Sequence, residues 1–294
     1  MNHRPTAPVA SAIRQQLAAI ATRHPSPRVR RLHLPLRALQ NAPAEGEHDA
    51  EFCAIELGDG AFGLSYVMLG GTLRDLLAAH GSAATAPLAD ADPMALAQHL
   101  TGGSEVERAI ALAAINAMTD SVWRRLGYEP PAAGNSLGDV VLGPQDHLGM
   151  IGFFPPLVQR VAEAGGRLSV VEMNAAMVAR QRERYPQITI GLDRALLADC
   201  NQVVGTSTIL LNDTLDGMLA AAPTATQFAV IGPSAGLWPD ALFERGVTLL
   251  GGTRVTDPTA FAQAMATGES FSASTRKFAI AKATWPGWRA MTGC

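Results

Sequence analysis

The stretch FAVIGPSAGLWPDALFERGVTLLGGTRVTDP, residues 228–258, decides the fold. An apolar run ends in the small loop 232–234, a segment of helical character follows, and a second apolar run ends over 251–254. Strand, helix and strand in this order are typical of parallel strands joined by right-handed crossovers. We therefore expect both glycine-bearing ends to lie at one edge of a sheet.

The same alternation fills the second half of the chain. Five apolar runs are each followed by a helical segment, and the runs are 149–153, 167–173, 201–207, 228–234 and 247–252. They are continuously apolar, as in strands buried on both faces. The sequence thus predicts an α/β fold with a Rossmann-like, mostly parallel sheet over residues 138–294.

The first half has a different pattern. Apolar residues at helical spacing predict a first helix near 10–20, and alternating stretches predict a small antiparallel sheet. Further helices are expected at 72–80, 93–100 and 105–126. We therefore expect a smaller α+β domain over 1–130, joined by a linker of prolines, glycines and small polar residues over 128–139.

Composition excludes several classes of protein. The net charge of −3 leaves no electrostatic footprint for nucleic acid. No apolar run approaches the roughly 18 residues that span a bilayer, and the start of the chain lacks the apolar core of a secretory signal. The three cysteines are far apart and form no CxxC. We expect a cytoplasmic protein without a membrane partner, whose length and composition are compatible with a homodimer.

Candidate ligand-binding residues follow the predicted strands. In open parallel sheets, ligands bind beyond the carboxyl ends of the strands, near the switch in strand order. The small, hydroxyl-bearing and charged residues expected there are Gly152, Glu172, Thr206, Thr208, Gly232, Ser234 and Arg254. Such a set suits a small anionic ligand held by backbone N–H groups and a few side chains.

A conventional NAD site is not expected. The loop 152–156 after the first strand carries one glycine and two prolines in place of GxGxxG, and proline donates no N–H to a pyrophosphate. Glu172 ends the second strand, where an acid often holds a ribose; as an alternative, it is a solvated carboxylate.

Three further features have two interpretations each. Arg254 either clamps a carboxylate or phosphate, or pairs with Asp257 or Asp240 and braces its loop. The hydroxyls of 206–208 bind ligand oxygens or cap the next helix. Asn116, in an apolar helix, is either a structural cross-link or a residue that points into a cleft between the domains.

Metal ligands are sparse. All seven histidines precede or begin the predicted Rossmann-like sheet, and none forms HExxH or another pair at helical spacing. A divalent metal ion remains a candidate cofactor, held by carboxylates or by a histidine of the first domain.

Several stretches resemble a known family. LGMIGFFPPL at 148–157, GTSTILLNDTLDGML at 205–219 and the latter part of the opening stretch resemble the "putative heavy-metal chelation" domain family, of unknown function, over residues 138–268. GLSY at 63–66 and AAINAM at 113–118 resemble its companion, which is similar to the N-terminal domain of enolase.

The resemblance implies an enolase-N-terminal-like domain packed on a Rossmann-like domain, with a cleft between them. The positions that match the patterned loops are Phe154, Glu172, Thr208, Asn212, Ser234 and Arg254, with Asn116 approaching from the first domain. We expect the cleft to bind a small anionic metabolite or a metal chelate, heavy-metal chelates included. The alternative is an enzyme, a lyase or transferase using a nucleotide or S-adenosylmethionine-type ligand in the same cleft.

Overall fold

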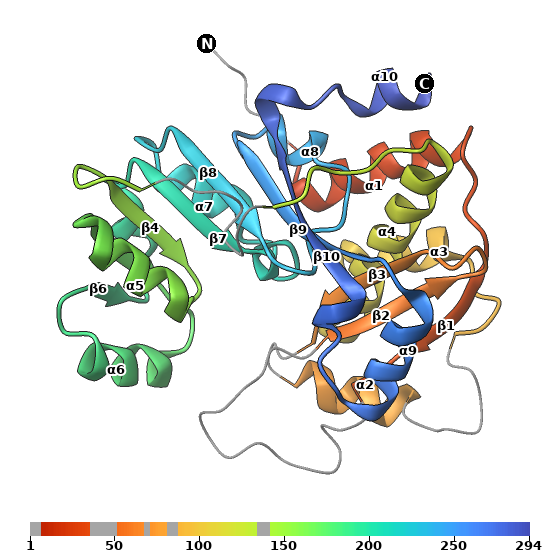
Figure 1. The fold of residues 1–294 in the computed structure, drawn as a ribbon, viewed down its shortest axis with the longest axis horizontal. Coiled ribbons are helices and arrows are strands. Elements are labelled where there is room, and N and C mark those ends of the chain that lie inside the picture. Colours follow the sequence, from red (N-terminus) through yellow and green to blue (C-terminus); the bar gives the residue numbers. More distant parts are fainter. Residues whose placement is uncertain (1–6, 36–51, 68–70, 81–87, 134–141) are drawn as a thin grey trace.

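The computed structural model describes residues 7–35, 52–67, 71–80, 88–133 and 142–294. Over these residues the chain forms one seven-stranded sheet and one three-stranded sheet, with helices around both (Figure 1).

The larger sheet has the strand order β10-β9-β8-β7-β4-β5-β6. Neighbouring strands are parallel, except that β10 pairs antiparallel with β9. The strands are β4 His147–Ile151, β5 Arg167–Val171, β6 Thr189–Gly191, β7 Gln202–Thr206, β8 Gln227–Ile231, β9 Leu249–Val255 and β10 Thr275–Ala281. The six parallel strands follow the order 3-2-1-4-5-6 of a Rossmann sheet. This confirms the predicted α/β fold and places the topological switch point between β4 and β7.

The predicted end of β9 is wrong. β9 does not stop at the double glycine but continues to Val255. A Cβ on Gly252 would clash with the ring of Phe278 on β10 and would lie 2.7 Å from the carbonyl oxygen of Ala235. Glycine is needed here because neighbouring segments pack closely against the strand, not because a loop begins.

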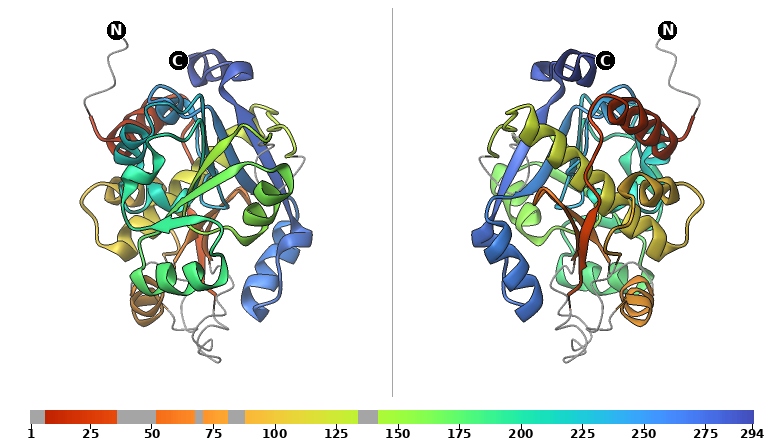
Figure 2. Two further views of the ribbon diagram at one scale, coloured as in Figure 1. Left: turned by 90° about the vertical axis from the view of Figure 1, so that its left-hand side faces the viewer. Right: turned by 90° about the vertical axis from the view of Figure 1, so that its right-hand side faces the viewer.

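Helices lie on both sides of the larger sheet (Figure 2). They are α5 Pro155–Ala164, α6 Ala175–Arg184, α7 Leu215–Ala221 and α8 Asp240–Phe243. A further helix, α9 Pro258–Thr267, follows β9 and packs against β1 of the smaller sheet. Proline begins α5 and Gly165 ends it in the left-handed conformation, φ 71°, as is typical of these two residues.

The smaller sheet is antiparallel, as expected, and has the order β1-β2-β3. Its strands are β1 Val29–His33, β2 Phe52–Leu57 and β3 Phe62–Tyr66. The accompanying helices are α1 Val9–Ala21, α2 Thr72–His80, α3 Pro93–Ala97 and α4 Glu105–Arg125. Parts of the predicted strands and of the 128–139 linker lie outside the described residues.

Helix α4 is the central element between the two sheets. It begins with a capping box in which Ser104 and Glu107 bond each other's backbone N–H groups. Every residue from Ala109 to Trp123 is buried, so the helix packs on all sides rather than along one stripe. A Cβ on Gly63 of β3 would overlap the α4 backbone, which shows how closely this strand approaches the helix.

The core is continuous across the two halves. One hydrophobic cluster contains buried residues of α1, β1, β2 and α4 together with residues of β7, β8 and α8. The last helix, α10 Trp288–Thr292, returns to the segment that follows α1, where the Thr292 carbonyl oxygen lies 3.2 Å from Nε2 of His24. The division into domains at 1–130 and 138–294 stays a prediction.

Candidate functional site

The switch point brings Gly152 and Thr206 together. Gly152 follows β4 with a φ of 79°, a conformation that favours glycine. Its N–H donates to the carbonyl oxygen of Val171 at 2.9 Å. A Cβ on Gly152 would lie 2.9 Å from Cγ2 of Thr206. The backbone at the end of β4 therefore lies directly against the end of β7.

Thr206 and Thr208 form the turn after β7. The Thr208 N–H donates to Oγ1 of Thr206 at 3.5 Å, at the start of the 3-10 turn Ser207–Leu210. Both threonines are partly exposed. The bond uses the Thr206 hydroxyl only as an acceptor, so its O–H is able to donate to a ligand.

Glu172 directly follows β5 and lies near Asn212. Its carboxylate is half-buried, and Oε1 accepts hydrogen bonds from the N–H groups of Met173 at 2.7 Å and Asn174 at 3.3 Å. Nδ2 of Asn212 lies 3.1 Å from Sδ of Met173, whose side chain is 64% exposed. The end of β5 and the loop after β7 are therefore side by side.

Phe154 and Gly232 occupy the flanking strand ends. Phe154 is the N-cap residue of α5, and it packs against the core that α5 covers. Gly232 follows β8 with a φ of 138°, and a Cβ there would contact the side chain of Ser207. Both residues lie at the predicted edge of the sheet.

Ser234 is fully buried and links the two sheets. Its Oγ accepts a hydrogen bond from the backbone N–H of Tyr66 at 2.9 Å, and its carbonyl oxygen accepts one from Nδ2 of Asn116 at 2.8 Å. Nδ2 of Asn116 also donates to Leu64 on β3 at 2.8 Å. Asn116 thus forms the structural cross-link that was one of its two interpretations.

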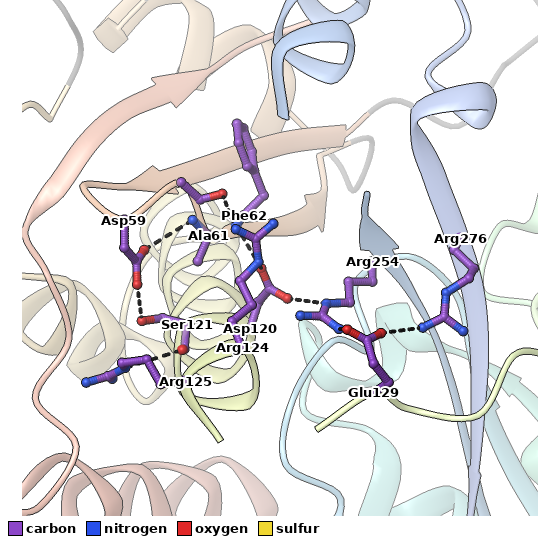
Figure 3. Close-up of polar contacts among 11 residues, drawn as sticks. Asp59, Ala61, Phe62, Asp120, Ser121, Arg124, Arg125, Glu129, Arg254 and Arg276 are labelled. Carbon is purple, nitrogen blue, oxygen red and sulfur yellow. Dashed lines mark hydrogen bonds and ion pairs between the residues drawn. The ribbon is translucent and has the colours of Figure 1, made fainter. Parts of the chain in front are cut away.

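Arg254 is held by two carboxylates, neither of which was expected. Its Nε donates to Oδ1 of Asp120 at 2.6 Å, and its Nη1 lies 2.8 Å from Oε1 of Glu129 (Figure 3). The predicted partners have other roles: Asp257 caps α9, and Asp240 bonds Gln16. The expectation failed because α4, far away in sequence, brings Asp120 to this strand.

The ion pair is enclosed. The side chains of Arg254 and Asp120 are 8% and 6% exposed. Burial raises the pKa of the Asp120 carboxyl, while the positive charges of Arg254 and Arg124 oppose that rise. A cavity of about 10 Å³, lined by Asn116, Asp120 and Arg254 among others, has room for about one water and not for a metabolite.

The predicted residues therefore divide into two groups. Those at the carboxyl edge of the sheet are Gly152, Phe154, Glu172, Thr206, Thr208, Asn212 and Gly232. Asn116, Ser234 and Arg254 lie in the packed contact between α4 and the sheet.

Tyr66 is a candidate that the sequence pattern did not single out. It ends β3 and is tied to the end of β8 through Ser234. Burial raises the pKa of its phenol, and the negative charge of Glu172 raises it further. The ring of Tyr66 packs edge-on against Phe52 of β2, with ring centroids 5.7 Å apart. Its position at a strand end, like that of Glu172, was the available signal.

No metal centre or membrane span is found among the residues that the structure describes. No three histidine, cysteine, aspartate or glutamate side chains within those ranges gather as metal ligands would, so they do not fit a resident metal ion. In the same ranges, no helix combines the length and hydrophobicity needed to cross a bilayer.

The sequence profile of the family DUF364, described as "Putative heavy-metal chelation", matches residues 137–284. An uncharacterized protein of Methanocaldococcus jannaschii is 27% identical over 161 residues, which cover 52% of this chain and 56% of that protein. The chain thus spans only about half the length of that relative.

Two crystal structures of DUF364 proteins of unknown function share the fold. That from Pyrococcus horikoshii has a TM-score of 0.64 and 18% identity, over 93% of this chain and 99% of the other. The structure from Desulfitobacterium hafniense has a TM-score of 0.63 and 20% identity, and the match covers 92% of this chain and 99% of the other. The enolase-like assignment of the first domain stays a prediction. From the profile match and these folds together, the chain belongs to the DUF364 family.

Proposed function

We propose that the carboxyl edge of the larger sheet binds a small anionic metabolite or a metal chelate, in a cleft between this edge and the smaller sheet. The supporting observation is the contact of Gly152 with Thr206 at the switch point, where Rossmann-type sheets bind ligands. The Thr206 hydroxyl and the Asn212 amide supply hydrogen-bond donors beside it.

A chelate fits this edge better than a bare ion. Glu172 offers a carboxylate, an oxygen ligand that Zn²⁺ and other divalent cations accept. One carboxylate is too few for a closed metal site, and the described residues gather no group of three ligands. A chelator that brings its own donor atoms would complete the coordination. The description of the DUF364 family as "Putative heavy-metal chelation" is compatible with such a ligand.

Thermal unfolding with defined probes tests the proposal. The full chain is heated with citrate, with Zn²⁺, Ni²⁺ or Cu²⁺ alone, and with each metal–citrate complex. A ligand at one hundred times its Kd stabilises the native state by about 2.7 kcal/mol, so a clear rise in Tm is expected with citrate or its complexes. The substitution Glu172→Gln should weaken the response to metal–citrate. Glu163→Gln, on the exposed surface of α5, is the matched control. The absence of any shift across the panel would refute the proposal.

A second candidate is an enzyme at the same edge, a lyase or transferase with a nucleotide or S-adenosylmethionine-type ligand. One observation favours it: Glu172 ends the second strand of the Rossmann order, where an acid bonds ribose hydroxyls. Titration with S-adenosylmethionine and with ATP, monitored by calorimetry, tests this candidate. Glu172→Gln should remove binding, and a wild-type protein that binds neither compound contradicts it.

A further inference from the structure

A small cavity lies where helix α4 meets both sheets. It measures about 10 Å³, and α4 contributes Asn116, Asp120 and Trp123 to its wall. These three residues are spaced about one turn apart and therefore lie on one face of the helix. Strand β9 contributes Arg254, and the loop after β8 contributes Gly236. The cavity is thus part of the contact that joins α4 to the larger sheet.

Two residues of this wall each carry a buried polar atom that bonds no protein atom within the described ranges: Oδ1 of Asn116 and Nε1 of Trp123. Asn116 is 2% exposed and Trp123 is 1% exposed. The orientation of the Asn116 amide is fixed, because its Nδ2 donates to the carbonyl oxygens of Leu64 and Ser234, each at 2.8 Å. Carbonyl oxygens only accept, so the atom left over is Oδ1. Leaving either atom unsatisfied would destabilise the fold.

The two atoms need a ligand that both accepts and donates hydrogen bonds. An indole N–H is a donor only, whereas an amide oxygen is an acceptor only. A metal cation would satisfy Oδ1 of Asn116 but not the N–H of Trp123, and an anion would do the reverse. A cavity of about 10 Å³ holds about one water-sized sphere, so a larger organic molecule does not fit. Water has both functions at this size, and buried waters typically make about three hydrogen bonds to such groups.

Buried indoles elsewhere in the molecule serve as a comparison. Nε1 of Trp238 and Nε1 of Trp285 are also buried without a protein partner in the described part of the chain. Neither residue lines this cavity. An indole N–H without a protein acceptor therefore does not mark a water site by itself. Trp123 differs because it borders a cavity of the right size and shares it with the acceptor of Asn116.

We propose that the cavity between α4 and the larger sheet binds one water molecule, which accepts a hydrogen bond from Nε1 of Trp123 and donates one to Oδ1 of Asn116. The Asp120–Arg254 ion pair lines the same cavity and offers further polar atoms to this water. The site is separate from the proposed ligand site at the carboxyl edge and goes beyond the proposed function. With the water bound, Asn116 uses its whole amide, and a connected polar network holds α4 against the sheets in addition to apolar packing.

Magnetic resonance of the full chain, labelled with nitrogen-15 at tryptophan, tests the proposal. A long-lived bound water gives NOE and ROE cross-peaks of opposite sign at the protons beside it, whereas rapidly exchanging surface water does not. We expect this signature at the indole proton of Trp123 and not at those of Trp238 and Trp285, with a Trp→Phe substitution at each position to assign the signals. A wild-type spectrum without the Trp123 cross-peak overturns the proposal. Equal cross-peaks at all three indoles also overturn it, because Trp123 alone of the three lines the cavity.

The variant Gly236→Ala supplies a second measurement. Its new Cβ would lie 3.3 Å from Cβ of Asn116 and 3.7 Å from Oδ1, and Gly236 has no left-handed φ that would strain an alanine. The methyl group should fill the cavity, so the Trp123 cross-peak should disappear and the number of long-lived waters from oxygen-17 relaxation dispersion should fall by about one. Gly58→Ala, outside the cavity, is the matched control and should retain both signals. A Gly236→Ala protein that keeps the cross-peak and the full number of waters overturns the proposal, and the wild-type spectrum decides alone if this variant does not fold.

Discussion

Replacing Arg254 by methionine should destabilise the protein strongly. The pair with Asp120 is almost completely enclosed, with side chains 8% and 6% exposed. Removing one partner of a buried pair typically costs about 3–5 kcal/mol, because the other charge is left uncompensated. Arg124 remains 3.1 Å from Asp120, and the Phe62 N–H remains 3.4 Å away. Because these two donors still bond Asp120, we expect the free energy of unfolding to fall by an amount at the lower end of this range, about 3 kcal/mol.

Urea denaturation measures this loss, and Arg276→Met is the matched control. Arg276 pairs with Glu129 at 2.9 Å, but the Glu129 side chain is 70% exposed, so the control should lose less than about 1 kcal/mol. Combining Arg254→Met with Asp120→Asn should recover part of the loss, since an amide needs no counter-charge. An Arg254→Met protein as stable as the control, but with weakened ligand binding, would show that Arg254 is a ligand residue and that the structural assignment is wrong.

Two further predictions concern packing and thiol chemistry. Gly63→Ala should lower the free energy of unfolding by more than about 3 kcal/mol, beyond ordinary overpacking, because the new methyl group would overlap the α4 backbone. The control is Gly58→Ala, whose new methyl group would have its nearest neighbour 3.5 Å away and whose stability should lie within about 1 kcal/mol of wild type. Equal urea midpoints for the two variants would refute the packing argument. At pH 8 a thiol reagent should modify exposed Cys294 alone, because burial raises the pKa of Cys53 to about 12 and that of Cys200 to about 11. Rapid modification of two or more thiols in the folded protein would contradict this prediction. Both pKa values lie above the unfolded value of 9.0, so these two thiols stabilise the fold below pH 9. That stabilisation should fall as the pH rises toward 11 and 12.

Much of the fold could be predicted because the signals were local. Continuous apolar runs indicated buried parallel strands, and the proline and glycine that bound α5 behaved as expected. The missed strands carry weaker signals: β6 has three residues, and β10 is an antiparallel strand whose first half is partly exposed. The two glycines of β9 were ambiguous because glycine marks both a turn and a close approach.

The candidate site could be predicted only in part, for a similar reason. Gly152, Thr206 and Glu172 lie where the rule for parallel sheets places them, since each strand end is fixed by its own run of residues. Arg254 was placed on the right strand but given the wrong partner, because no spacing in the sequence indicates that Asp120 of α4 reaches it. Tyr66 was missed because its link to the end of β8, through Ser234, depends on how two distant segments pack.

The attachment of α4 to both β8 and β9 limits how the protein can move. A rigid-body hinge between the halves would break the buried Asp120–Arg254 pair and the hydrogen bonds that Asn116 and the Tyr66 N–H donate to Ser234. Such a motion is far more costly than rearrangement of a single loop. Entry of the proposed ligand would therefore require only local side-chain and loop adjustment, and amide hydrogens in the middle of α4 should exchange only when the whole molecule unfolds.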